Sequence, residues 1–563
     1  MNSKYKFRFV LVAAAILATV GCTEDFLDTK MDTQKTPEQI ATDRASLWYY
    51  ANAFYSPMTY GFSVLDGNLF AAASDEAQQT AASSNANYFN QGMINASVNP
   101  LSGLYKNYYE GIRAANFFLD YSKNGKQMIA MNRDTVKETT SYHDDLNFLK
   151  WYRAEAHVAR AYYYAELIKM YGGVPIVEKT LDQSAGTYIA RSSYDDVVAY
   201  IVKEIDTYKD SLQVNWLTTS SYISQDGRFT LGAALAIKAR VLLYAASPLH
   251  NSTNDVEKWK KAAIAASAVM TTAGLNYDLD ATNGYRNYFL GATPLGNKET
   301  VLAVRRGANN TMESLNYPIG TSGGNSGVCP SHNLVADYEY IGTPDAIDIY
   351  KNRDPRLAAT VVLNGSTWTS RTIDESAGGT DDMAKANTSK TGYYLKKFLT
   401  DALNLTQGAT AQHQWVAYRY AEVLLNYAEA VNEGYGGPDQ AVPGNTMTAR
   451  QALKKVRDRA STLLPLVTTT DQATFRAALK HERRIELAFE DHRYWDLLRW
   501  KDAKVVLNQP LQGVKIAKDA SGKFSYQVVN IASRVFNDRN YYMPFSRSEV
   551  ANSNGTLVQN DGY

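Results

Sequence analysis

Cysteine is nearly absent from this sequence: only Cys22 and Cys329 occur among 563 residues. Cys22 directly follows an apolar leader, where we expect it to be lipidated, which leaves Cys329 without an intramolecular partner. A disulfide framework is therefore excluded, and the fold must be stabilised by its hydrophobic core.

Long apolar runs are also scarce. Lys4, Lys6 and Arg8 precede the apolar run 9–20, whose 12 residues fall short of the roughly 20 needed to span a bilayer. This pattern is typical of a signal peptide. Thr19-Val20-Gly21-Cys22 resembles the bacterial lipobox, in which the cysteine is acylated and becomes the new N-terminus. We therefore predict a signal peptide over 1–21, a lipidated Cys22 with a polar tether over 22–36, and one folded domain over 37–563.

The sequence also has no excess of positive over negative charge, or of negative over positive. The chain has 58 basic and 57 acidic residues, and removal of the leader would change the net charge from +1 to −2. Nucleic acid is therefore excluded as an expected partner, because phosphate neutralisation requires clustered basic residues.

Histidine is too sparse for an evident metal site. His481-Glu482 begins like a zinc-protease helix but lacks the second histidine. Asp278, Asp280 and Asn283-Gly284 only faintly resemble a calcium loop, because the glycine is misplaced and the distal glutamate is missing. We predict no cofactor.

Tyrosine, in contrast, is abundant, with 40 residues against 18 phenylalanines and 8 tryptophans. A core requires only the ring, so this excess favours half-exposed aromatic surfaces, with the ring packed and the hydroxyl group in water.

Helical periodicity dominates most of the chain. Leu149, Tyr152, Ala156, Ala159 and Tyr163 recur at spacings of three and four, which predicts one helix face that continues to Met170. Further helices are expected over 195–212, 231–246, around 259–269 and 420–431, and over 447–461 and 472–490. Small residues on these faces favour closely packed helix pairs, as in tetratricopeptide repeats. The predicted fold class is mainly α, a tetratricopeptide-like scaffold of helix pairs with a large irregular, loop-rich ligand-binding half.

Two insertions interrupt the helical pattern, near 80–102 and 275–410. Both are rich in Gly, Ser, Thr and Asn, and such loops on a rigid scaffold often carry binding sites. Within the second, Gly320-Thr321-Ser322-Gly323-Gly324 matches the nucleophile-elbow pattern, but no strand or helix is expected around it. We interpret it as a plain loop.

Glu482, Glu486 and Glu490 are expected one turn apart on a helix, and paired carboxylates can hydrolyse glycosides. Arg483, Arg484, Arg493 and Arg499 are interleaved with them. Arginines favour the charged carboxylate, whereas a general acid needs a raised pKa. We therefore expect ion pairs between helices and no enzyme activity, with a lipid-anchored glycoside hydrolase as the less favoured alternative.

The order of motifs along the chain resembles the SusD/RagB family of outer-membrane lipoproteins of Bacteroidetes. The C-terminal motifs are Arg419–Ala430, Val456–Ala460, Glu482–Leu487, Arg493–Trp500 and Gln559–Tyr563, and those nearer the N-terminus include Asp25–Asp28, Arg160–Tyr164, Tyr171–Pro175, Gly227–Thr230, Ala246–Pro248 and Thr391–Tyr394.

The resemblance implies a non-enzymatic receptor, lipid-anchored in the outer membrane and facing the cell surface. Such a receptor captures oligosaccharide and delivers it to a SusC-like TonB-dependent outer-membrane barrel. A peptide ligand for the same receptor remains an open alternative.

Candidate ligand-binding residues come from chemistry and position in the two insertions. Aromatic rings match the apolar faces of sugars, while Asn and Arg match their hydroxyl groups. The residues expected to bind ligand are Tyr88, Phe89, Asn90, Tyr285, Arg286, Tyr288, Tyr317 and Trp368. No catalytic residue is expected.

Overall fold

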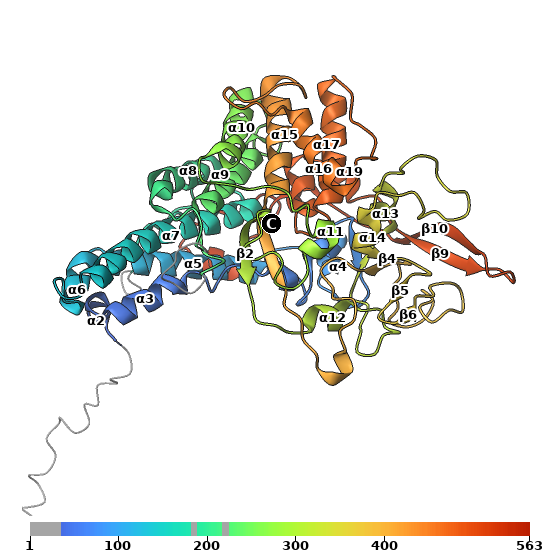
Figure 1. The fold of residues 1–563 in the computed structure, drawn as a ribbon, viewed down its shortest axis with the longest axis horizontal. Helices are drawn as coiled ribbons and strands as arrows, with labels where there is room; N and C mark the ends of the chain where they lie inside the picture. The colour runs from blue at the N-terminus through green and yellow to red at the C-terminus, as the bar shows by residue number, and fades with distance from the viewer. Residues whose placement is uncertain (1–34, 182–187, 217–224) are drawn as a thin grey trace, which may run out of the picture.

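The structure, a computed structural model, describes residues 35–181, 188–216 and 225–563 (Figure 1). The predicted signal peptide and Cys22 lie outside this part of the chain. None of the described helices combines the length and the apolar character that crossing a membrane requires.

Long helices packed in consecutive pairs form the scaffold, as the sequence predicts (Figure 1). The 33-residue helix α7 contacts α5 on one side and α8 on the other. The series continues through contacts of α8 with α9, α9 with α10, α10 with α15, and α15 with both α16 and α17. These helices are α5 (Ser102–Tyr121), α7 (Thr139–Tyr171), α8 (Tyr194–Tyr208), α9 (Leu231–Ala246), α10 (Val256–Thr271), α15 (Tyr420–Tyr435), α16 (Ala449–Ala460) and α17 (Gln472–Glu486).

Local sequence signals fix the ends of several of these helices. The Thr230 hydroxyl accepts a hydrogen bond from the Ala233 amide at the start of α9. Thr448 and Gln451 form a reciprocal capping box at the start of α16. Gly172 ends α7 with a φ of 71°, a backbone conformation that glycine adopts without steric cost.

Helix α17 ends four residues earlier than the predicted range 472–490. Phe489 and Asp491 both have φ above 60°, in the left-handed region that a helix cannot contain. The carboxylate of Glu490 therefore comes from the turn after α17, and the expectation that it continues the helical spacing of Glu482 and Glu486 is wrong.

Short helices flank the scaffold and are interspersed among the turns and irregular segments of the loop-rich half. The short α-helices are α2 (Pro37–Thr42), α3 (Arg44–Ala53), α4 (Ala86–Asn90), α6 (Gly125–Asn132), α11 (Gly284–Tyr288), α12 (Thr311–Asn316), α13 (His332–Asp337), α14 (Arg356–Thr360), α18 (Arg493–Arg499), α19 (Ala503–Val506) and α20 (Arg547–Asn552). The 3-10 turns are η2 (Gly61–Ser63), η3 (Phe70–Ala73), η5 (Lys209–Ser211), η6 (Leu405–Gln407) and η7 (Asp538–Tyr541).

The described strands pair two by two in antiparallel ladders. The hairpin of β9 and β10 projects from the loop-rich side of the molecule (Figure 1). Strand β8 leads directly into α15, so its pairing with β2 ties the second insertion to the scaffold. The pairs are β1 (Ala77–Gln79) with β3 (Val328–Pro330), β2 (Thr300–Arg305) with β8 (Gln414–Arg419), β4 (Val361–Val362) with β7 (Tyr394–Leu395), β5 (Thr367–Trp368) with β6 (Arg371–Thr372), and β9 (Leu511–Lys518) with β10 (Phe524–Ala532).

The hydrophobic core runs through both halves of the molecule. Buried residues from Leu47 to Leu557 form one cluster that includes the helix faces and the loop aromatics. Trp259 and Trp495 belong to this cluster, and Trp500 is also buried. The loop-rich half is therefore packed onto the scaffold and positions its own surface loops.

Candidate ligand-binding face

The two predicted insertions meet in space. Strand β1, which directly precedes the first insertion, pairs with β3 of the second. Directly after β1, the Thr80 amide donates to the Gly327 carbonyl over 2.9 Å, and the Thr80 hydroxyl donates to the Ser326 carbonyl.

Further contacts add two more segments. The Tyr317 hydroxyl donates to the Thr400 carbonyl and accepts from the Leu403 amide over 3.2 Å. The Tyr317 ring lies edge-on to Trp368, with 5.7 Å between centroids, and the Arg371 guanidinium donates to the Thr321 hydroxyl. We call the surface formed by residues 78–90, 317–327, 366–372 and 399–408 the loop face.

Oriented amide groups stand on this face. The side-chain NH₂ of Asn85 donates to Asp66, that of Asn87 to the Ala82 carbonyl over 2.7 Å, and that of Asn325 to the Ser314 carbonyl over 2.8 Å. All three asparagines are exposed. Because the NH₂ groups are fixed, the side-chain carbonyl oxygens are held as acceptors suited to hydroxyl donors.

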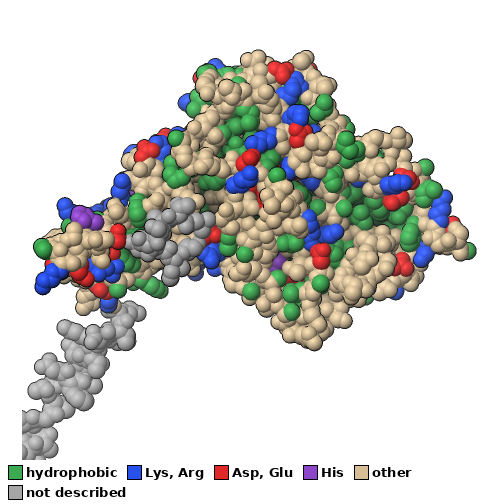
Figure 2. All heavy atoms as spheres, viewed as in Figure 1, with side chains coloured by type: hydrophobic (Ala, Val, Ile, Leu, Met, Phe, Trp, Pro, Cys, Tyr) green, Lys and Arg blue, Asp and Glu red, His purple; other side chains and the backbone are tan. Residues whose placement is uncertain are grey.

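Charged groups are sparse on the same side of the molecule. Figure 2 shows mostly uncharged polar and hydrophobic atoms over the region around α12, β5 and β6. Arg371 is neutralised by a bidentate ion pair with the buried Asp381, at 2.6 and 2.7 Å. The face is therefore suited to a ligand that offers many hydroxyl or amide groups.

The predicted aromatic residues of the second insertion are buried beneath the surface of the loops that carry them. Tyr285 donates its hydroxyl to the Glu486 carbonyl over 2.9 Å, and the Tyr288 hydroxyl contacts that of Thr300 over 2.7 Å. Tyr288 and Tyr317 have no exposed area, and Trp368 is only 3% exposed. In this conformation the rings of these four residues pack inside the loops.

Helix α4 carries the three predicted residues of the first insertion. Phe89 packs edge-on against Phe70 and Tyr494, at 5.1 and 5.7 Å between centroids. Asn90 donates to the Ala72 carbonyl and accepts from Arg534, so both ends of its side chain are occupied. Tyr88 is half-buried.

Arg286 lies apart from these residues, where it pairs with Asp401 and donates to the Leu399 carbonyl. Of the predicted set, the structure thus brings Tyr317 and Trp368 into mutual contact and places Arg286 near them through the segment 399–403. That these eight residues bind ligand stays a prediction.

Several polar residues of the loop face were not predicted individually. Asp66 accepts from the Ser84 hydroxyl and from the Asn85 amide, at 2.6 and 2.9 Å, although it is 19 residues away from Asn85 along the chain. The Ser- and Asn-rich composition of 80–90 indicates a polar loop, but only the structure shows which amides are fixed.

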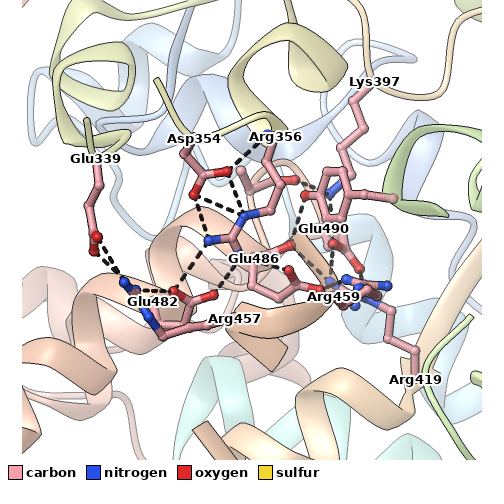
Figure 3. Close-up of polar contacts among 12 residues, drawn as sticks. Glu339, Asp354, Arg356, Lys397, Arg419, Arg457, Arg459, Glu482, Glu486 and Glu490 are labelled. Atoms are coloured by element: carbon pink, nitrogen blue, oxygen red, sulfur yellow. Dashed lines mark hydrogen bonds and ion pairs between the residues drawn. The ribbon is translucent and has the colours of Figure 1, made fainter. Parts of the chain in front are cut away.

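The carboxylates considered for glycoside hydrolysis lie in a buried ion-pair network (Figure 3). Glu486 accepts from Arg356 and Arg419 over 2.9 and 2.7 Å, and also from Arg459. Glu482 pairs with Arg457 and Arg356, whereas Glu490 pairs with Arg419 and Lys397. None of the three glutamates is more than 6% exposed, so substrate cannot reach them without unpacking the core.

The electrostatics of this network oppose acid catalysis. Burial alone would raise the pKa of Glu486, but Arg459, Arg419 and Arg356 outweigh it and hold the pKa well below its ordinary value. A general acid needs the opposite shift. The arrangement therefore supports the interpretation of these carboxylates as ion pairs between elements.

The faint calcium-loop pattern forms a closed turn. Asp280 accepts hydrogen bonds from the Thr282 amide, from the backbone and side chain of Asn283, and from Asn297 over 2.6 Å. Within the described ranges, no group of three or more His, Cys, Asp or Glu side chains is placed to hold a metal ion.

The Gly320–Gly324 segment lacks the surroundings of a nucleophile elbow. It forms turns in which the Thr321 amide donates to the Pro318 carbonyl and the Gly324 amide to the Thr321 carbonyl. Neither a strand before it nor a helix after it holds Ser322, which confirms the interpretation as a loop.

Comparison with known proteins identifies the class to which this scaffold and loop face belong. Two family models match the chain: "SusD family" over residues 297–563, and "Starch-binding associating with outer membrane" over residues 25–243. The chain belongs to the SusD family, as its order of motifs indicates.

Individual relatives agree over the whole length. "SusD-like protein P2" of Formosa agariphila is 23% identical, over 100% of both chains. A SusD-like protein of Bacteroides fragilis has a solved structure that superposes with a TM-score of 0.74 at 26% identity, covering 94% of this chain and 100% of the other. A laminarin-binding SusD-like protein shares the fold, with a TM-score of 0.63 at 20% identity, covering 92% of this chain and 99% of the other.

Proposed function

We propose that this protein is a non-enzymatic cell-surface receptor that captures oligosaccharide on the loop face and delivers it to a SusC-like TonB-dependent barrel. The observation that carries the proposal is the convergence of both insertions into one polar surface on a packed helical scaffold, where Thr80 bonds to Ser326 and Gly327. The carbohydrate ligands named for relatives, starch and laminarin, support this class of ligand.

The chemistry of the loop face matches the ligand. Fixed amide oxygens at Asn85, Asn87 and Asn325 can accept hydrogen bonds from sugar hydroxyl groups, and Tyr88 offers a half-exposed ring for an apolar sugar face. A few such contacts, set against the cost of association, give weak to moderate affinity. That affinity suits a receptor that must release its ligand to a transporter.

Calorimetry with a panel of oligosaccharides and peptides tests the ligand class. We expect an oligosaccharide to bind without turnover, and Tyr88→Ala or Asn87→Ala to weaken binding. Tyr49→Ala is the matched control, because Tyr49 is 72% exposed but lies on α3 at the scaffold. Binding of peptides alone would replace the glycan proposal with the peptide alternative, and steady product release would favour the hydrolase.

We also propose that acylated Cys22 anchors the mature chain in the outer membrane. Cys22→Ala should move the protein from the membrane fraction to the soluble fraction.

Gentle detergent extraction of the wild-type protein should recover a large outer-membrane barrel with it, whereas recovery of the receptor alone would count against the transporter partner.

A further inference from the structure

Lys396 and Lys397 are neighbours in sequence but extend to different environments. Lys397 is 1% exposed and forms an ion pair with Glu490 over 2.7 Å inside the core. Lys396 directly follows strand β7 and is half-buried. Lys396 therefore keeps partial contact with solvent, whereas Lys397 is enclosed in the core.

Arg286 adds a second positive charge at this place. Its Nη2 donates to Asp401, at 2.5 Å, and to the Leu399 carbonyl. Its Nε and Nη1 are buried and have no acceptor within the described part of the chain. A buried charged donor without an acceptor is costly, so the guanidinium is undersatisfied.

Negative charge is deficient around these two cations. Burial lowers the pKa of Arg286, and burial together with the charge of Arg286 lowers the pKa of Lys396. The opposing carboxylate is Asp401, whose side chain is 64% exposed. Asp401 thus pairs with Arg286 and can turn into solvent, whereas Lys396 forms no ion pair within the described residues.

The cluster adjoins the loop face. Asp401 lies between Thr400, whose carbonyl accepts from the Tyr317 hydroxyl, and Leu403, whose amide donates to the same hydroxyl. Tyr317 in turn contacts Trp368. Asp401, whose side chain is 64% exposed, is therefore accessible to a ligand on the loop face.

We propose that Arg286 and Lys396 form a subsite for an oxyanion substituent of the bound glycan, a carboxylate or a sulfate, which displaces Asp401. Once Asp401 is displaced, the Nη2 of Arg286 can donate to either group, and the ammonium of Lys396 adds attraction without fixed geometry. The inference rests on the proposed function and assigns acidic glycans as its ligand class.

Calorimetry at low ionic strength tests the subsite with three probes of equal length: a neutral galactan oligosaccharide, an oligogalacturonate and a sulfated galactan oligosaccharide. At least one acidic probe should bind about tenfold more tightly than the neutral one, a difference of about 1.4 kcal/mol, and added salt should reduce the difference. The two acidic probes distinguish a carboxylate from a sulfate.

Variants distinguish a role of these residues in ligand recognition from a role in the stability of the fold. Lys396→Gln should reduce the affinity for the acidic probe to that for the neutral probe, whereas Lys396→Arg should retain it. Asp401→Asn should increase acidic binding, because the competing carboxylate is removed. Lys385→Gln is the matched control, since Lys385 is an exposed lysine of the same insertion that donates to the Gly379 carbonyl.

Equal binding of neutral and acidic probes, or no gain in Asp401→Asn, would overturn the subsite but leave the receptor function intact. Failure of every glycan to bind would overturn the proposed function itself. Arg286→Gln would not distinguish lost recognition from lost stability, because Arg286 is largely buried and contributes to the packing of the fold.

Discussion

Glu486 is the residue on which the buried ion-pair network depends most directly, because it contacts three arginines. We expect Glu486→Gln to lower the free energy of unfolding by about 3–5 kcal/mol, since it leaves buried positive charge uncompensated. Urea denaturation monitored by circular dichroism measures this change.

The control for Glu486 is Glu257→Gln on α10, which removes an ion pair with Lys260 between two exposed side chains. We expect little change, because solvent screens such pairs. An equally small effect of Glu486→Gln would show that the network does not stabilise the fold.

Glu339 gives the network a pH dependence. Burial would raise its pKa, but hydrogen bonds from His481 and Arg457 outweigh burial and lower the pKa to about 2, from an ordinary 4.5. A lowered carboxyl pKa stabilises the fold fully above pH 4.5, and this contribution is lost as the pH falls towards 2.

The free energy of unfolding of Glu339→Gln should therefore be lower than that of the wild type at pH 6. The two proteins should converge between pH 4.5 and 2, as measured by urea denaturation across that range. A constant difference across this range would contradict the assignment of the pKa shift to Glu339.

The sequence does not predict which tyrosine hydroxyl groups are exposed and which are buried. The excess of tyrosine predicts solvent-exposed hydroxyl groups. Tyr163 and Tyr317 are nevertheless fully buried, and their hydroxyl groups donate hydrogen bonds to the carbonyls of Phe54 and Thr400. Composition cannot distinguish a phenol that meets water from one that meets a backbone acceptor distant in sequence, because both satisfy the hydroxyl.

At the scale of elements, the scaffold depends on the close approach of α10 and α15. A Cβ built on Gly434 of α15 would lie 2.9 Å from the Lys260 amide nitrogen of α10, which is backbone that cannot turn away. We expect Gly434→Ala to destabilise the protein by about 1–3 kcal/mol by separating the helices, as measured by denaturant unfolding.

Gly103→Ala on α5 is the matched control, because nothing lies within 4 Å of the added methyl group. Alanine is the better helix former, so we expect this variant to be as stable as the wild type or more stable by up to about 1 kcal/mol. Destabilisation by both substitutions would show that the helix contact is not the cause.

Helices with local start and stop signals are the elements that the sequence predicts well. The range 231–246 matches α9 because Thr230 caps its start and Pro248 follows its end. In contrast, the end of α17 is set by positive φ at Phe489 and Asp491, which no glycine or proline marks. Pairings such as β1 with β3 join segments about 250 residues apart and leave no periodic signal.

The sequence predicts the region of the candidate site better than it predicts the individual residues. Composition located the two insertions, but ring burial at Tyr285, Tyr288 and Trp368 depends on long-range packing. The grouping of Lys396 and Asp401 with Arg286 arises only in the folded chain, and no local sequence pattern predicts it. The proposed ligand-binding surface is therefore a property of the assembled loops.

At the scale of the whole molecule, the helical scaffold and the loop-rich half share one hydrophobic cluster. The ion-pair network also joins them, because Lys397 of the second insertion pairs with Glu490 beyond α17, and Arg356 pairs with Glu482 and Glu486 of α17 (Figure 3). We expect both halves to unfold together, although chains of this length often unfold in separate steps.

Differential scanning calorimetry of the mature chain should therefore show a single transition. Lys397→Met leaves Glu490 with one partner fewer and should lower the Tm by about 3 °C, without splitting the transition. Two resolved transitions in the wild-type protein would contradict this expectation, because they would mean that the loop-rich half can lose its structure while the scaffold persists. A single transition would mean that the stability of the entire fold holds the loop face in place. The proposed receptor function requires this, because the binding surface must be formed before the ligand arrives.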